Sequence, residues 1–73
     1  MKTYTLWAQE RDGELARVPF KRAIEPRGNA MEGALRTSAK ATLCDLILTC
    51  GRAHVATFRN GQITALDGKE YKA

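Results

Sequence analysis

Hydrophobic and polar residues alternate along the first segment, Thr3–Gln9, which reads TYTLWAQ. Tyr4 and Leu6 fall on one side of an extended chain, and Thr5 and Trp7 fall on the other. A period of two residues is typical of a β-strand, and aromatic and β-branched residues favour that conformation. The segment is therefore predicted to be a strand.

The residues that follow predict the return of a hairpin. Asp12 and Gly13 form a favoured turn pair, and the run Leu15–Phe20 comes directly after it. Pro19 has no backbone N–H, which confines such a strand to the edge of a sheet. We predict a short edge strand here.

A connector and a helix are predicted next. The segment Lys21–Asn29 contains a proline and a glycine that interrupt regular structure. Asn29 stands three residues before Glu32, as in a capping box, so a helix is predicted to begin near Ala30. Poor helix formers in its first turns leave a start at Ser38 as the alternative.

A helical stripe supports a long helix. Its apolar residues recur at intervals of four, four, three and four, at Leu35, Ala39, Leu43, Leu46 and Cys50. Gly51 follows as a helix stop. The competing interpretation takes Asp45–Cys50 as a strand, because its β-branched residues also suit one. We favour the helix, since the stripe continues to the glycine.

The segment 54–68, HVATFRNGQITALDG, predicts a second hairpin. Asn60 and Gly61 suit the two central positions of a type I′ turn, where both residues need a positive φ. The pairs that this turn places opposite one another are Phe58 with Ile63, Ala56 with Ala65, and His54 with Asp67. A three-residue loop would put Ile63 on the wrong side, so the apolar pairing selects this register.

These elements predict an α+β fold, in which a small antiparallel sheet packs on one helix. The chain of 73 residues has room for one domain, residues 1–73, with residues 69–73 expected to fray. The predicted core contains Leu43, Leu46, Phe58 and Ile63.

The composition is that of a globular protein with a basic surface. Hydrophobic residues make up 44% of the chain, which argues against disorder. The longest apolar run is far shorter than a membrane span, and the N-terminal residues lack the apolar region of a signal peptide. We therefore expect a cytoplasmic protein with no membrane partner and with free thiols at Cys44 and Cys50.

Catalytic and metal motifs are weak. Cys50, His54 and Asp67 suggest a nucleophile, but Cys50 would lie at the carboxyl end of the predicted helix, where the dipole disfavours a thiolate. Cys44, Cys50 and His54 have no conventional zinc spacing. We expect no enzymatic activity, no metal, no other cofactor and no small-molecule substrate.

Arginines and aromatic residues are the candidates for binding a partner. The net charge is +4, which favours polyanions or acidic protein surfaces. The candidate residues are Arg17, Lys21, Arg22, Arg27, Arg36, Lys40, Arg59, Gln62, Trp7 and Phe20. The two aromatic residues belong to this set only if they are exposed, and for Trp7 a place in the core is the favoured alternative. A basic segment with an aromatic residue can contact phosphate and stack on a base, although a solvated connector has the same composition.

The layout of TYTLWAQ, the small-residue segment SAKATLCDL and the hairpin FRNGQI resembles that of small proteins encoded by phages and mobile elements, among them inhibitors of bacterial CRISPR defence. This resemblance implies a cytoplasmic protein that binds a large host complex, and it assigns no functional residue.

The sequence thus favours a non-catalytic binding protein that docks on a host protein or nucleoprotein complex, one that handles nucleic acid, and inhibits or modulates it. Direct nucleic-acid binding through the basic surface is the main alternative. A small enzyme or a zinc module is the remaining one.

Overall fold

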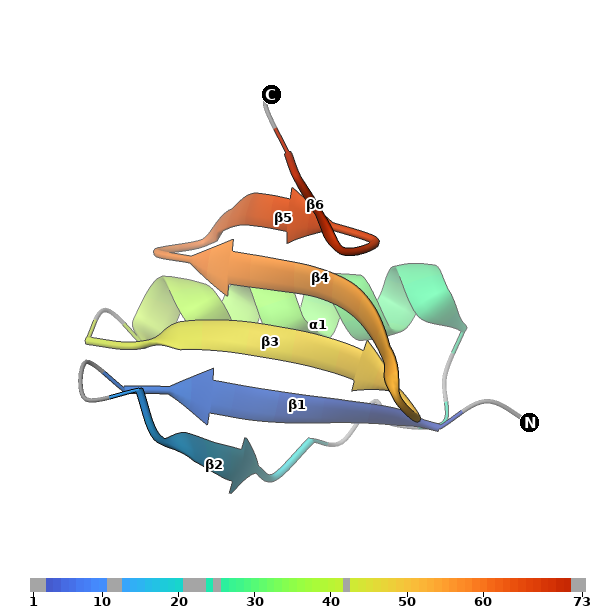
Figure 1. The fold of residues 1–73 in the computed structure, drawn as a ribbon, viewed down its shortest axis with the longest axis horizontal. Helices are drawn as coiled ribbons and strands as arrows, with labels where there is room; N and C mark the ends of the chain where they lie inside the picture. The colour runs from blue at the N-terminus through green and yellow to red at the C-terminus, as the bar shows by residue number, and fades with distance from the viewer. Residues whose placement is uncertain (1–2, 11–12, 21–23, 25, 42, 72–73) are drawn as a thin grey trace.

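A computed structural model describes residues 3–10, 13–20, 24, 26–41 and 43–71. One helix packs on one face of a six-stranded antiparallel sheet (Figure 1), so the predicted α+β fold is confirmed. The elements are β1 (Tyr4–Gln9), β2 (Leu15–Val18), α1 (Arg27–Lys40), β3 (Asp45–Cys50), β4 (Ala53–Arg59), β5 (Gln62–Leu66) and β6 (Lys69–Glu70). Their order across the sheet is β2-β1-β3-β4-β5-β6.

The predicted pairing of the first hairpin is confirmed, although its second strand is shorter than Leu15–Phe20. Asp12 of the predicted turn lies outside the described residues. β1 and β2 pair antiparallel, with Leu6 opposite Val18 and Trp7 opposite Arg17. β2 lies at the edge of the sheet and ends directly before Pro19. The missing N–H of the proline explains why the strand stops four residues after it begins.

The prediction of a long helix is wrong, and the competing interpretation of Asp45–Cys50 as a strand is confirmed. The segment Asp45–Cys50 forms β3, which lies between β1 and β4 in the sheet. Leu46 and Leu48 are buried, whereas Ile47 and Thr49 are only partly buried. A short apolar run fits a buried strand as well as a helix, so periodicity alone could not separate the two. Pairing on both sides makes it a strand.

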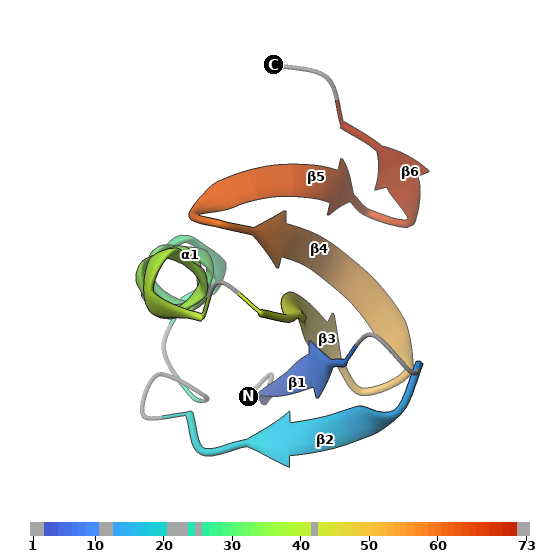
Figure 2. The same cartoon turned by 90° about the vertical axis from the view of Figure 1, so that its left-hand side faces the viewer.

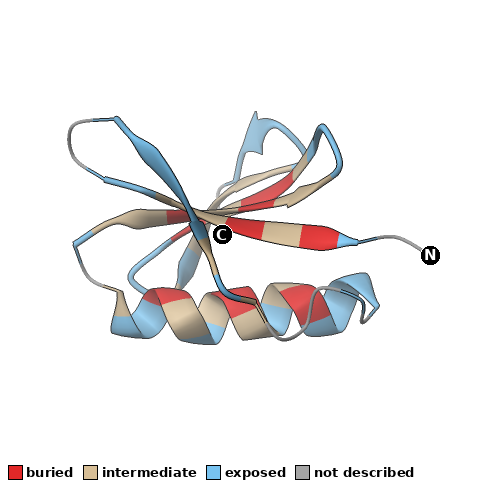
Figure 3. Cartoon of the chain, turned by 90° about the horizontal axis from the view of Figure 1, so that it is seen from below, coloured by how far each residue is buried: buried red, intermediate tan, exposed pale blue. Residues whose placement is uncertain are grey.

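The helix α1 begins earlier and uses a different stripe from the predicted one. It starts after Pro26, ahead of both predicted starts, and Asn29 lies inside it rather than at its cap. Proline suits this place because the first N–H groups of a helix have no intrahelical acceptor. Its buried residues are Ala30, Ala34 and Ser38, and Figure 3 shows them on the side that faces the sheet. These small residues let the helix approach the strands closely.

The second hairpin has the predicted turn. Asn60 and Gly61 have φ values of 51° and 76°, as a type I′ turn requires. The predicted pairing of Phe58 with Ile63 is confirmed. Gly61 also docks on α1, because its N–H donates to Ser38 Oγ at 3.1 Å.

Farther from the turn the predicted register is wrong by one residue. A bulge between Thr57 and Phe58 places Ala56 opposite Leu66 instead of Ala65. An extra residue of this kind shifts every later pair. His54 therefore does not face Asp67.

The C-terminal residues continue the sheet. Asp67 and Gly68 form a second turn with φ values of 51° and 79°, and β6 then pairs with β5. Lys69 and Glu70, which were expected to fray, thus belong to the sheet. Residues 72 and 73 of that tail lie outside the described residues.

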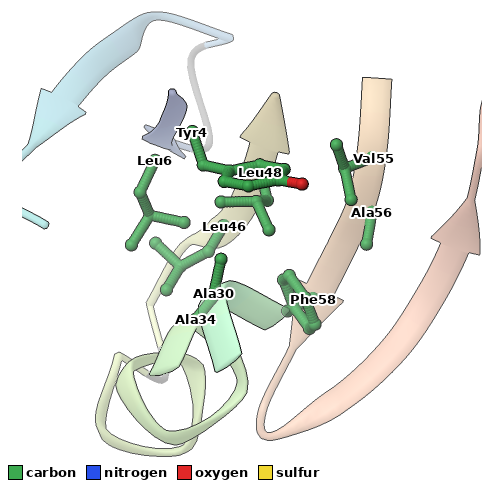
Figure 4. Packing of buried hydrophobic residues seen from close by; sticks show 9 residues of the cluster. All are labelled: Tyr4, Leu6, Ala30, Ala34, Leu46, Leu48, Val55, Ala56 and Phe58. Atoms are coloured by element: carbon green, nitrogen blue, oxygen red, sulfur yellow. The ribbon is translucent and has the colours of Figure 1, made fainter. Parts of the chain in front are cut away.

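The core lies between α1 and the sheet (Figure 4). Its buried hydrophobic residues are Tyr4, Leu6, Ala30, Ala34, Leu46, Leu48, Val55, Ala56 and Phe58. Of the four predicted core residues, Leu46 and Phe58 are buried and Ile63 is partly buried. Leu43 is 75% exposed, because the chain has left the helix before it, so its place in the core is a wrong prediction.

Candidate protein-binding face

The face of the sheet opposite α1 is not covered by any element that the structure describes (Figure 2). Side chains on a strand point alternately to the two faces, so the residues between the buried positions project here. We call this surface the open face. The strand registers arrange its side chains in three rows that run across the strands.

The three rows are defined by neighbouring pairs in the registers. The middle row, in the order of the strands, is Arg17, Trp7, Ile47, Thr57, Ala65 and Glu70. The row nearer the β1–β2 turn is Leu15, Gln9, Asp45, Arg59 and Gln62. The third row is Thr5, Thr49 and His54.

Trp7 is held in place near the centre of the open face. Its indole Nε1 donates to Thr49 Oγ1 at 3.0 Å, which fixes the ring towards the third row. The side chain is partly buried. Its neighbour across the β1–β2 pair is Arg17, which is exposed and forms no ion pair with any described residue. Tryptophan and arginine are enriched among the residues that dominate protein interfaces.

Arg59 and Asp45 form a bidentate ion pair in the row nearer the β1–β2 turn. Arg59 Nε donates to Oδ1 and Nη2 donates to Oδ2, each at 2.8 Å. The hydrogen bonds from Arg59 hold the pKa of the Asp45 carboxyl below its ordinary value, although partial burial opposes this effect. The same bonds raise the pKa of Arg59. The pair therefore adds no net charge to the open face.

Replacing Arg59 with glutamine should raise the pKa of Asp45 towards the ordinary value of about 3.9. The native pair stabilises the fold above the pKa of Asp45 in the unfolded chain. That stabilisation is lost as the pH falls through the lower pKa of the folded state. NMR titration of the Asp45 carboxyl carbon in both proteins measures the shift. An equal pKa in both would contradict the pair.

His54 has a structural place at one end of the open face. Gly68 N–H donates to His54 Nδ1 at 2.8 Å, and Nε2 lies 2.8 Å from Thr57 Oγ1. Since Nδ1 accepts, the proton of the neutral ring is on Nε2 and is donated to Thr57. Both ring nitrogens thus hold the hairpin and the turn before β6.

The groups considered for catalysis and for zinc do not assemble. Cys50 lies in register with Tyr4, on the helix side of the sheet, whereas His54 is opposite Thr49 on the open face. Both Cys44 and Cys50 are free thiols. Among the described residues, no three His, Cys, Asp or Glu side chains are grouped as a metal site.

The remaining candidates are scattered around α1 and the connector. Arg27 pairs with Asp67 at 2.6 Å, and Arg36 pairs with Glu32 at 2.7 Å. Lys40 is exposed and has no ion pair within the described part of the chain.

Within the described part of the connector, no basic residues come together as a binding site. Phe20 is partly buried and packs against the core. Ile24 of the same segment is 66% exposed. Lys21 and Arg22 lie outside the described residues.

The structure brings four of the predicted candidates onto one surface. These are Trp7, Arg17, Arg59 and Gln62. Sequence reasoning missed Ile47 and Thr49 there, because it placed them in a helix. The alternation within DLILTC was the signal that could have found them.

Comparison with known proteins adds no family. We found no match to a protein-family model, a curated protein or a solved structure. Fold and surface together define a small α+β protein in which the described elements cover one face of the sheet. Within the described residues, α1 is too short and too polar to cross a membrane.

Proposed function

We propose that this chain is a non-catalytic binding protein that docks through its open face on a protein of a host complex, one that handles nucleic acid, and so inhibits or modulates that complex. The observation that carries the proposal is the position of Trp7, which is fixed beside Arg17 on a sheet face that no described element covers. Arg17 has no ion-pair partner among the described residues. A fixed tryptophan loses little conformational entropy when a partner covers it.

Charge favours a protein partner over nucleic acid. Of the five basic candidates that the structure describes, three form ion pairs with carboxylates: Arg27, Arg36 and Arg59. Nucleic-acid affinity arises mainly from cations that neutralise phosphates, and these three cations are already neutralised. The centre of the open face is instead poor in charge, as the cores of protein interfaces are.

The partner surface is defined by the same residues. A shallow apolar recess would receive the Trp7 ring, and a carboxylate would lie next to Arg17. The choice of a cytoplasmic host complex rests on the net charge of +4 and on the resemblance in layout to small phage and mobile-element proteins.

Changing Trp7 to alanine should weaken capture of the partner by about 30-fold, since interface hot spots contribute at least about 2 kcal/mol. Affinity capture from bacterial lysate, followed by mass spectrometry and then by titration of the captured protein, measures this loss. Arg17→Ser should weaken binding too. Lys40→Ser, on the helix side, is the matched control and should bind like the native protein.

The alternative function gives a different result. If purified protein binds random DNA or RNA with an affinity that falls steeply with salt, and if Lys40→Ser lowers it as much as Arg17→Ser, direct nucleic-acid binding replaces the proposal. A captured partner that Trp7→Ala and Arg17→Ser both retain in full would also overturn it.

A further inference from the structure

The middle row of the open face is complementary to its own reverse. It begins with a cation, Arg17, on β2 and ends with an anion, Glu70, on β6. The second residue from one end is the large Trp7, and the second from the other end is the small Ala65. The two halves of the row are therefore opposite to each other in both charge and side-chain size.

A two-fold axis along the strands would bring this complementarity together. Such an axis lays two open faces on each other and reverses the order of the strands, as in the aligned packing of two sheets. Arg17 of each copy then faces Glu70 of the other. Trp7 faces Ala65, and Ile47 faces Thr57.

The row nearer the β1–β2 turn fits the same arrangement. The reversal sets Gln9 over Gln62 and Asp45 over Arg59 of the other copy. The two ion pairs could thus join in one network of four charges. Reversal of either row brings no two like charges opposite each other, which would otherwise oppose association.

We propose that a second copy of this chain occupies the open face in the free protein. The product is a symmetric dimer with two sheets inside and the two α1 helices outside. Because the proposed function assigns the same face to a host partner, self-association would regulate docking by covering Trp7 until that partner displaces the second copy. Only this regulatory step rests on the proposed function.

The size of the open face sets the strength of the dimer. Six strands spaced about 4.8 Å apart and three rows of side chains give a face of roughly 24 Å by 17 Å, or about 400 Å² for each copy. Interfaces of this size are small and transient. We expect a dissociation constant on the order of 10–100 µM.

Sedimentation equilibrium of the purified chain between about 1 µM and 1 mM tests the dimer without any partner. The mass should rise from one copy to two across this range. Trp7 is the single tryptophan of the chain, so tryptophan fluorescence reports on the open face alone. Trp7 emission should move to shorter wavelength over the same concentrations, as the second copy excludes water from the ring.

A charge exchange tests the arrangement. Arg17→Glu should weaken the dimer by at least about tenfold, because it sets two carboxylates opposite each other. The double variant Arg17→Glu with Glu70→Arg should restore it. Lys40→Glu is the control: it changes the net charge by the same −2, from +4 to +2, but lies on the helix side. Circular dichroism establishes that each variant is folded.

Three results would overturn the proposal. They are a single-copy mass up to 1 mM (roughly the upper limit for a transient dimer), equal weakening by Arg17→Glu and Lys40→Glu, and a double variant no stronger than Arg17→Glu. None of them touches the proposed function, which fails separately if Trp7→Ala leaves partner capture unchanged. A dimer that persists while capture is unaffected by Trp7→Ala would retain this inference and reject the docking role.

Discussion

Replacing Leu46 with alanine should lower the free energy of unfolding by about 2–5 kcal/mol, a range measured for large-to-small changes in protein cores. Leu46 is 1% exposed and lies opposite Phe58 in the sheet, beneath α1. The surrounding strands are fixed by pairing on both sides, so the cavity can collapse only in part. Thermal and urea unfolding measure the loss, which in so small a domain approaches its whole stability.

Leu43→Ala is the matched control. The predicted helix put Leu43 and Leu46 on one stripe, where both changes would cost about as much as each other. The structure leaves Leu43 75% exposed, and the same substitution there should stay within about 0.5 kcal/mol. Equal losses at the two positions would contradict β3 and restore the long helix.

Replacing Gly61 with alanine should cost about 2–5 kcal/mol for two separate reasons. Its φ is 76°, a conformation that costs a residue with a Cβ about 1–2 kcal/mol. An added Cβ would also lie 3.1 Å from Ala39 Cβ in α1, so the helix must move, at a cost of about 1–3 kcal/mol. The shift would strain the bond from Gly61 N–H to Ser38 Oγ. Chemical denaturation measures the sum.

The turn before β6 provides the control for this strain. Asp67 and Gly68 repeat the φ values of Asn60 and Gly61 within a few degrees, but an added Cβ at Gly68 meets nothing within 4 Å. Gly68→Ala should therefore show only the cost of the positive φ. The difference between the two variants measures how tightly the hairpin packs on α1, and a difference of zero would show that it does not.

Local chemistry was enough to predict both hairpins. Asn60 and Gly61 tolerate positive φ, so the type I′ turn and the pairing of Phe58 with Ile63 follow from a few adjacent residues. Pro19 likewise marks β2 as an edge strand. The α+β class follows from the same kind of pattern, since each of these signals lies within a few adjacent residues.

Part of the candidate site was also predictable from the sequence. Alternation in TYTLWAQ places Trp7 on the other side of the strand from Tyr4 and Leu6 before any fold is known, but it does not show which side faces the core. It also cannot provide the neighbour on the next strand. Arg17 and Ile47 come next to Trp7 only through pairing between segments far apart in the chain.

The sequence by itself determined the Asn60–Gly61 turn and the edge strand β2, because these depend on the backbone preferences of a few adjacent residues. The tertiary structure decided between an exposed and a core position for Trp7, which alternation within one strand left open. Only the tertiary structure decided that Asp45–Cys50 is a strand, since its apolar residues suit either conformation until β1 and β4 pair with its backbone. It also decided which cations are paired, because the carboxylate partners of Arg27 and Arg59 stand 40 and 14 residues away. Long-range contacts of this kind leave no local pattern in the sequence. A count of basic residues therefore overstates the number of cations that remain available for a partner on the folded surface.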